Sequence, residues 1–193
     1  MLQRISAAAV LTAGLMLSAC AGRDYKPVSD FPVKIGSAYT VAGKTYVPKI
    51  DPDYDMLGYA SWYGNESGDM TANGEKFRPD WITAANKTLP LPTYVEVTAL
   101  DTGRTILVRV NDRGPFHPGR IIDLSRGAAE ALGIRARGYA RVRVRRVEPP
   151  EKDRKRLRDG KEARARPAPS DRALQSLRAQ FDAGVRQGLI PPG

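Results

Sequence analysis

The sequence predicts a mainly β protein built around one small domain, with extensions at both ends. Glycine and proline are frequent, with 18 Gly and 15 Pro among 193 residues, which favours many tight turns between short strands. Segments in which apolar and polar residues alternate recur between residues 58 and 147, as expected for half-buried strands. The composition changes on both sides of this region, so we expect a single domain of about 100 residues with two appendages.

The first 19 residues have the composition of a bacterial signal peptide. A positive charge precedes an apolar core from residue 7 to residue 17, which is too short to span a membrane as a mature helix. Residues 17–20 read Leu-Ser-Ala-Cys and are similar to a lipobox, and Cys20 is the single cysteine. We expect removal of residues 1–19, lipid attachment to Cys20 and no internal disulfide. An ordinary signal peptide with an incidental cysteine is the alternative.

The lipid on Cys20 would anchor the protein in a bacterial cell envelope, facing the periplasm. Ala21 follows the cysteine in place of an aspartate, which favours the outer membrane over the inner one. The formal net charge of +10 suits nucleic acid, anionic lipid or an acidic polymer. Because the first segment exports the chain, we expect no nucleic-acid partner.

Residues 20–57 are expected to form a tether that contains short β segments. Two β-prone fragments flank Gly43 between residues 39 and 48, which predicts a hairpin. The domain then begins with a strand at residues 58–64, where Trp62 faces away from its neighbours Ser61 and Tyr63. Trp62 is either a core residue or a platform for a ligand.

Two strands joined by a tight turn form the centre of the predicted domain. Residues 94–100 alternate between apolar and polar side chains, and residues 101–104 form a turn around Gly103. Residues 105–110 return and lead directly into the next two polar residues. This pattern places Asp112 at the end of a strand, on the rim of the sheet.

A short helix and a last strand complete the domain. The apolar run at residues 121–124 leads to Ser125, which can cap a helix over residues 126–132. Residues 139–147 alternate as a strand with arginines on one face. These arginines form either a solvated face or a positive wall for a polyanionic glycan. The row consists of Arg141, Arg143 and Arg145.

The C-terminal appendage has two parts. Residues 148–169 are rich in charge, proline and alanine, which predicts a solvated linker with transient helix. Residues 170–193 contain an amphipathic helix that Ser170 can cap and Gly188 can end. An isolated helix of this length is marginal in water. We therefore expect it to pack on the domain or on another protein, such as a divisome or envelope protein.

Three segments carry most of the functional information. Residues 71–75, 83–90 and 110–116 each set polar or ionisable side chains beside glycine or proline, a composition typical of sites built on tight turns. We expect these segments to meet in one cleft. The chain has one histidine, His117, and one cysteine, so no metal site is predicted, and no cofactor-binding motif is visible.

At these residues the chain resembles the rare lipoprotein A family of septal-ring lytic transglycosylases. The resemblance covers residues 58–147 and includes residues 120–125 after the third segment. It implies a six-stranded double-psi β-barrel with one or two short helices. It also implies endolytic cleavage of peptidoglycan strands, preferably those without stem peptides, to 1,6-anhydro-muramic ends during cell-wall remodelling and cell division.

The family's catalytic residues fall on Glu75, on position 86 and on Asp112. The family usually has histidine at position 86, and this chain has Asn86. Histidine exchanges a proton near neutral pH, whereas an amide only donates and accepts hydrogen bonds. The reaction needs one acid/base, because the sugar's own 6-hydroxyl attacks the anomeric carbon. The resemblance therefore implies Asp112 as acid/base, Glu75 as a second carboxyl that binds sugar or stabilises positive charge, and Asn86 as an orienting residue.

Two alternatives stay open at this point. Asp112 could cap its own turn and Glu75 could be a solvated loop acid, while His117 is either a replacement proton carrier or a loop residue. The whole domain could also be a non-catalytic peptidoglycan-binding lipoprotein, as Asn86 suggests. The candidate substrate-binding residues are Trp62, Tyr63, Asn73, Asn111 and Arg113.

Overall fold

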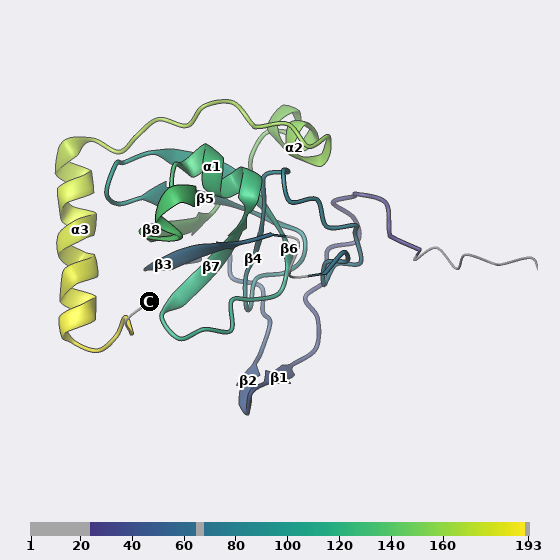
Figure 1. The fold of residues 1–193 in the computed structure, drawn as a ribbon, viewed down its shortest axis with the longest axis horizontal. Helices are drawn as coiled ribbons and strands as arrows, with labels where there is room; N and C mark the ends of the chain where they lie inside the picture. The colour runs from purple at the N-terminus through teal and green to yellow at the C-terminus, as the bar shows by residue number, and fades with distance from the viewer. Residues whose placement is uncertain (1–23, 65–67, 192–193) are drawn as a thin grey trace, which may run out of the picture.

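The barrel is formed by six strands that close on themselves in a computed structural model, which describes residues 24–64 and 68–191 (Figure 1). The strands follow the order β3-β7-β4-β6-β5-β8, with parallel pairing of β3 to β7 and of β4 to β6. The predicted six-stranded barrel is confirmed. The strands are β3 (Asp55–Tyr63), β4 (Thr83–Ala85), β5 (Thr93–Ala99), β6 (Thr105–Asp112), β7 (Arg120–Ser125) and β8 (Tyr139–Arg146).

The barrel interior is filled by the apolar residues that the alternation predicts. Val95 and Val97 of β5 and Val108 and Val110 of β6 are fully buried. Full burial of an aliphatic side chain of this size contributes about 1.5–3 kcal/mol. This core fixes the register of the strands, because a one-residue slip would move every valine to the opposite face.

The predicted hairpin is confirmed and stands beside the barrel (Figure 1). It consists of β1 (Tyr39–Val41) and β2 (Lys44–Tyr46), which pair in antiparallel fashion. The Tyr39 hydroxyl donates to the carbonyl of Lys87 at 2.7 Å. The Tyr46 ring lies 5.6 Å from the ring of Phe116. The hairpin therefore packs against the loop that follows β6.

The short helix α1 (Arg126–Leu132) has the boundaries that the sequence predicts. The Ser125 hydroxyl accepts a hydrogen bond from the backbone N–H of Ala128 at 3.1 Å. Gly133 ends the helix with φ at 80°, a left-handed conformation in which glycine has no Cβ to clash. A 3-10 turn, η2 (Arg135–Arg137), follows before β8.

The region expected to be a solvated linker instead contains a helix that packs on the barrel. This helix, α2 (Glu151–Arg158), buries Leu157 and Asp153. Asp153 pairs with Arg164 at 2.9 Å, and Arg158 forms an ion pair with Asp30. The charged residues of this region therefore pair both with one another and with the N-terminal segment.

The last helix, α3 (Asp171–Arg186), lies along one side of the barrel (Figure 1). Leu174 and Phe181 are buried against Leu100, with Leu57 and Tyr59 packed around them. The Ser170 hydroxyl caps the helix by accepting from the N–H of Ala173 at 3.3 Å. The sequence predicts that this helix packs either on the domain or on another protein, and in the structure it packs on the barrel.

The arginines of β8 are ion-paired in the structure. Arg141 lies 2.6 Å from Asp101, and Arg145 lies 2.6 Å from Glu96. Arg143 pairs with Asp55. This pairing favours a solvated, charge-balanced face over a positive wall for glycan.

The predicted N-terminal signal and the lipidation candidate Cys20 lie outside the described residues. Within residues 24–64 and 68–191, no helix has the length and apolar character needed to cross a membrane.

Candidate active site

The Asp112 cleft is a hollow of about 310 Å³ at one end of the barrel. It combines the end of β6, the loop that follows it, the end of β3 and the middle of β7. Two of its lining residues are carboxylic acids, Asp112 and Asp123. The lining residues are Tyr63, Met70, Ala85, Asp112, Arg113, Gly114, Pro115, Phe116 and Asp123.

Asp112 is held by two backbone hydrogen bonds on one of its oxygens. Oδ1 accepts from the N–H of Ala72 and from the N–H of Arg113, both at 2.8 Å. Within the part of the chain that the structure describes, Oδ2 has no such bond. Burial raises the pKa of Asp112, and the opposing backbone hydrogen bonds and the charge of Arg113 do not cancel this effect. A carboxyl with a raised pKa is suited to general acid catalysis.

Arg113 does not neutralise Asp112, although the two residues are adjacent. Its guanidinium donates to the carbonyl of Leu89 at 2.5 Å and to that of Ile35 at 2.8 Å. The side chain thus points toward the N-terminal segment, as opposite orientation of neighbouring residues predicts. Arg113 lines the cleft, but its guanidinium donates its hydrogen bonds to backbone carbonyls.

Asp123 is the functional candidate that sequence reasoning did not single out. Ala85 of β4 pairs with Asp112 on β6 and with Asp123 on β7, so the two acids flank this small residue from either side. Asp123 accepts from the Ser61 hydroxyl and lies 3.6 Å from Arg120. Burial raises its pKa, and the hydrogen bond of Ser61 and the charge of Arg120 only partly oppose the rise.

The sequence did contain a signal for Asp123. It is the one charged residue in the apolar run at residues 121–124, and charged residues are rarely placed in such strands without a reason. An aspartate inside a short apolar run is therefore the signal by which sequence alone indicates this acid.

Tyr63 lies beside both acids, which supports its prediction as a substrate contact. Its hydroxyl is buried and has no hydrogen-bond partner among the described residues. Burial raises the pKa of this phenol well above its ordinary value, and the charges of Asp112 and Asp123 raise it further. The ring stacks on Phe77 with 4.9 Å between centroids. The phenol therefore stays protonated and can donate a hydrogen bond into the cleft.

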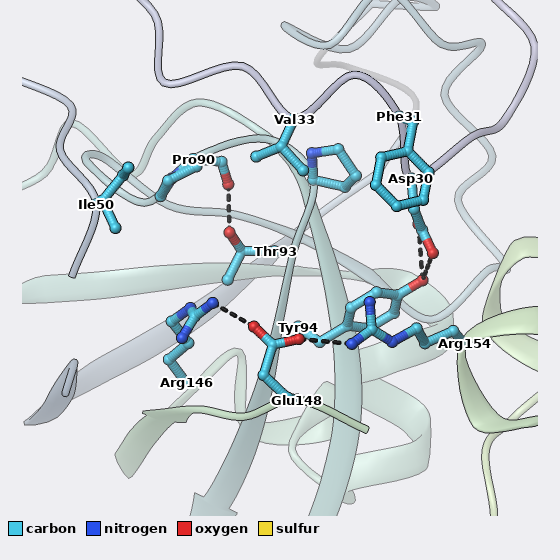
Figure 2. A pocket seen from close by; sticks show the side chains of 11 residues that line it. Asp30, Phe31, Val33, Ile50, Pro90, Thr93, Tyr94, Arg146, Glu148 and Arg154 are labelled. Carbon is cyan, nitrogen blue, oxygen red and sulfur yellow. Dashed lines mark hydrogen bonds and ion pairs between the residues drawn. The ribbon is translucent and has the colours of Figure 1, made fainter. Parts of the chain in front are cut away.

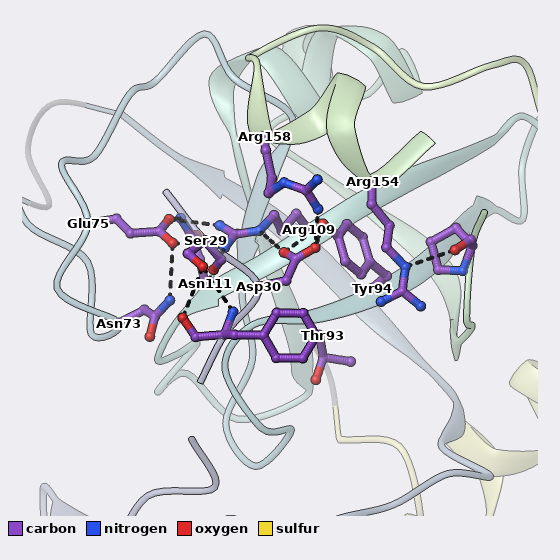
Figure 3. Close-up of polar contacts among 12 residues, drawn as sticks. Ser29, Asp30, Asn73, Glu75, Thr93, Tyr94, Arg109, Asn111, Arg154 and Arg158 are labelled. Carbon is purple, nitrogen blue, oxygen red and sulfur yellow. Dashed lines mark hydrogen bonds and ion pairs between the residues drawn. The ribbon is translucent and has the colours of Figure 1, made fainter. Parts of the chain in front are cut away.

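Glu75 lies in a buried ionic cluster and not in the Asp112 cleft (Figure 3). Arg109 binds both carboxylate oxygens of Glu75, at 2.7 and 2.8 Å. Asn111 and Asn73 donate to the same carboxylate at 2.9 and 3.1 Å. Burial raises the pKa of Glu75, but the hydrogen bonds and charge of Arg109 outweigh it, so the pKa is lowered. Each oxygen of this carboxylate accepts two of these hydrogen bonds, and the roles toward substrate expected for Glu75 and its two asparagine donors stay predictions.

The same cluster joins the tether and α2 to the barrel. Arg109 also contacts Asp30 at 3.2 Å, and Asp30 pairs with Arg158 of α2. Tyr94 donates to Asp30 at 2.9 Å. Segments far apart in the sequence thus meet around one buried guanidinium, as Figure 3 shows.

Asn86 is buried and has a full set of hydrogen bonds. Its side-chain oxygen accepts from the N–H groups of Thr88 and Leu89, both at 2.9 Å. Its amide nitrogen donates to the Tyr54 hydroxyl and to the Ile121 carbonyl, both at 3.1 Å. With 1% of its surface exposed, it shapes the turn after β4. It does not line the Asp112 cleft, and its expected role as an orienting residue stays a prediction.

Two other predicted residues also lie elsewhere. Trp62 packs against the barrel core and donates to the Arg135 carbonyl at 3.2 Å, which agrees with its interpretation as a core residue. His117 is exposed in the loop after β6 and does not line the cleft. Among the residues that the structure describes, no group of three His, Cys, Asp or Glu residues could hold a metal ion.

A second hollow, of about 210 Å³, lies near the tether and β5 (Figure 2). Its acids are already paired: Asp30 accepts from Tyr94, and Glu148 binds Arg146 and Arg154. Neither carboxylate is free to act on a ligand. The chemistry therefore points to the Asp112 cleft.

Comparison with known proteins agrees with this fold. Residues 55–144 match the family described as lytic transglycolase. The chain is 56% identical over 113 residues to an endolytic peptidoglycan transglycosylase RlpA of Pseudomonas aeruginosa, and 47% identical over 115 residues to one of Rickettsia bellii. Each match covers 58% of this chain, with 33% and 51% of the respective relative. The chain thus spans at most about half of these relatives. A Streptomyces papain inhibitor is similar over 52% of the chain, with 25% identity and a TM-score of 0.44.

The barrel is a double-psi β-barrel domain, and its residues 55–144 are those that match the lytic transglycolase family. The relatives that it matches are endolytic peptidoglycan transglycosylases RlpA, so the domain is similar to the rare lipoprotein A (RlpA) family.

Proposed function

We propose that this protein is a lytic transglycosylase that cleaves the glycan strands of peptidoglycan. The observation that carries the proposal is Asp112, a carboxyl in an open cleft with a raised pKa and one oxygen that has no hydrogen bond among the described residues. The names of the relatives support the substrate and the reaction.

In the proposed reaction, Asp112 donates its proton to the glycosidic oxygen between N-acetylmuramic acid and N-acetylglucosamine. The bond from the anomeric carbon to this oxygen breaks, and its electrons stay on the leaving N-acetylglucosamine. The 6-hydroxyl of the muramic acid then bonds to the anomeric carbon and returns its proton to Asp112. The product is a 1,6-anhydro end, and no water is consumed.

The role given by resemblance to Glu75 passes to Asp123 in this proposal. An ionised carboxylate across Ala85 from the acid can stabilise positive charge at the anomeric carbon. Ser61 and Arg120 favour the ionised form of Asp123 and orient it. Tyr63 offers a hydrogen bond to a sugar oxygen from a buried phenol.

The finer features of the proposal come from the sequence. Lipid attachment at Cys20 would place the domain in the periplasm, on the outer membrane, where it would act on strands without stem peptides during cell division. The experiment that tests the reaction is mass spectrometry of fragments released from peptide-stripped sacculi. Release of anhydro-muramic ends, lost in Asp112→Asn, is expected.

Binding of the sacculi without any anhydro product would instead support a non-catalytic glycan-binding lipoprotein. Asn86 favoured that alternative on sequence grounds. Because its side chain lies outside the cleft, Asn86→His is not expected to change which of the two results is seen.

A further inference from the structure

A third hollow, of about 390 Å³, adjoins the Asp112 cleft across Phe116, which lines both. We call it the basic hollow. Its walls come from the β1–β2 hairpin, the start of β3, the loop after β6, the start of β7 and the tail after α3. Its lining residues are Lys44, Tyr46, Met56, Leu57, Lys87, Phe116, His117, Pro118, Gly119, Arg120, Ile121, Leu189, Ile190 and Pro191.

The ionisable charges of the basic hollow are of one sign. Lys44, Lys87 and Arg120 line it, and none of its described lining residues is acidic. Burial lowers the pKa of Lys87, and the repulsion from Lys44 and Arg120 lowers it further, against a weaker opposing effect of Asp123. Like charges held this close repel one another, so a bound anion would stabilise all three.

The basic hollow is also connected to the candidate acids. The Lys87 ammonium donates to the carbonyl of Arg120, and the guanidinium of Arg120 contacts Ser61 and Asp123. The two hollows are thus adjacent, joined by Phe116, which lines both.

Exposed apolar side chains complete the walls. Phe116 is 41% exposed and Leu189 is 74% exposed, although both are large. Leu189 belongs to the C-terminal tail, which is tied back to α3 by its N–H bonding to the Gly184 carbonyl at 2.9 Å. Apolar walls with a few convergent charges are typical of ligand sites.

We propose that the basic hollow is a glycan subsite that binds the lactyl carboxylate of a muramic acid neighbouring the scissile bond, with the C-terminal tail as one wall. The inference rests on the proposed function. The lactyl carboxylate carries a charge only where no stem peptide is attached to it. Lys44 and Lys87 would therefore select stripped strands by charge, and the appendage is a part of the binding surface.

The test measures binding in an Asp112→Asn background, so that the strands are not cut. Peptide-stripped strands are compared with the same strands after carbodiimide coupling to methylamine, which turns each carboxylate into a neutral amide. The starting protein is expected to bind native strands about tenfold more tightly or better, as for a hydrogen bond to a charged group. Lys44→Gln, and Lys44→Gln with Lys87→Gln, should bind native strands more weakly and lose the preference.

Lys152→Gln is the matched control, because Lys152 is exposed on α2 away from the hollow. It should keep the full preference. An unchanged preference in both lysine variants would overturn the subsite, as would an equal loss in the control. Because binding is read without cleavage, a protein that binds selectively but yields no anhydro ends would refute the proposed reaction and leave the subsite in place.

The tail is tested by Leu189→Ser against Val185→Ser. Val185 is 37% exposed on α3 and does not line the hollow. Leu189→Ser should weaken binding of native and amidated strands alike by several-fold, because it removes apolar contact and not charge. Equal binding by the two serine variants would exclude the tail from the subsite.

Discussion

Glu75 lies in a loop that is hydrogen-bonded to Asp112 at the end of β6, yet the two carboxylates have different partners. Glu75 accepts four side-chain hydrogen bonds, two of them from Arg109. Asp112 accepts two backbone hydrogen bonds on a single oxygen. The two regions are connected, because the loop that holds Glu75 also supplies the Ala72 N–H that binds Asp112.

Burial alone does not decide which acid keeps its proton. It raises the pKa of both residues, and only the partners differ. Arg109 reverses the effect at Glu75, whereas Arg113 is turned away from Asp112 toward backbone carbonyls. An acidic residue of a sequence motif can therefore be a buried structural residue. The candidate acid/base is the carboxyl that has no arginine bound to it.

Exchanging the two carboxyls for amides should give the largest contrast. Asp112→Asn is expected to slow release of anhydro ends about 10²–10⁴-fold, the usual contribution of a general acid/base. Glu75→Gln keeps the shape of a residue that does not face the cleft. Its main effect should be on the free energy of unfolding, measured in urea by circular dichroism at matched temperature.

Equal losses of activity in the two variants, with both still folded at assay temperature, would contradict this division of roles. Asp123→Asn sharpens the comparison. We expect a smaller rate loss than for Asp112→Asn, since Asp123 is assigned to charge stabilisation and not to proton transfer.

Removing the guanidinium should test the buried cluster next. Arg109→Met leaves the buried carboxylate of Glu75 without its ion-pair partner, which costs about 3–5 kcal/mol in the free energy of unfolding, whereas Asp30 keeps its ion pair with Arg158. Arg145→Met is the control, because the Arg145–Glu96 pair is partly exposed and such pairs contribute at most about 1 kcal/mol. Similar urea midpoints for the two variants would show that the cluster is not a structural anchor.

Elements set by local sequence could be predicted, and α1 shows why. Its cap Ser125 and its left-handed Gly133 act on the adjacent turns, so neighbours in sequence contain the whole signal. The position of Asp112 at the end of β6 followed from alternation in the same way. The barrel as a closed sheet was implied by the family resemblance and not by any single segment.

The roles of Glu75, Asn86 and α2 could not be predicted, because their partners are distant. Arg109 reaches Glu75 only after β6 pairs into the barrel, and Arg158 reaches Asp30 across most of the chain. From sequence alone, a charge-rich segment such as residues 148–169 is predicted to be solvated, because its ion-pair partners are not known. Asp123 is hard to predict as a site residue because its sequence neighbours are apolar and indicate only a strand.

Asn86 offers a weaker test of the same division. Asn86→Ala leaves the N–H groups of Thr88 and Leu89 without an acceptor, at a cost of about 2 kcal/mol in the free energy of unfolding. Activity at a temperature where the variant is folded should change little, because position 86 does not line the cleft. A rate loss as large as that of Asp112→Asn would place this residue among the catalytic groups.

The contributions of Glu75 and Asp112 to the free energy of unfolding should change with pH in opposite directions. The folded pKa of Glu75 is lowered, so its ionised form contributes stability above its unfolded pKa of about 4.3. That contribution is lost as the pH falls through the folded pKa. The folded pKa of Asp112 is raised, so its ionisation lowers stability as the pH rises from its unfolded pKa of about 3.9 through the folded value.

Urea unfolding of Glu75→Gln and Asp112→Asn between pH 3 and pH 7 measures this difference directly. Relative to the native protein, Glu75→Gln should be destabilised most at pH 7 and progressively less toward acid. Asp112→Asn should gain relative stability as the pH rises, because the amide removes a charge that the folded state disfavours. Parallel pH profiles for the two variants would mean that the two carboxyls have the same kind of environment, which would remove the physical basis for assigning the proton transfer to Asp112.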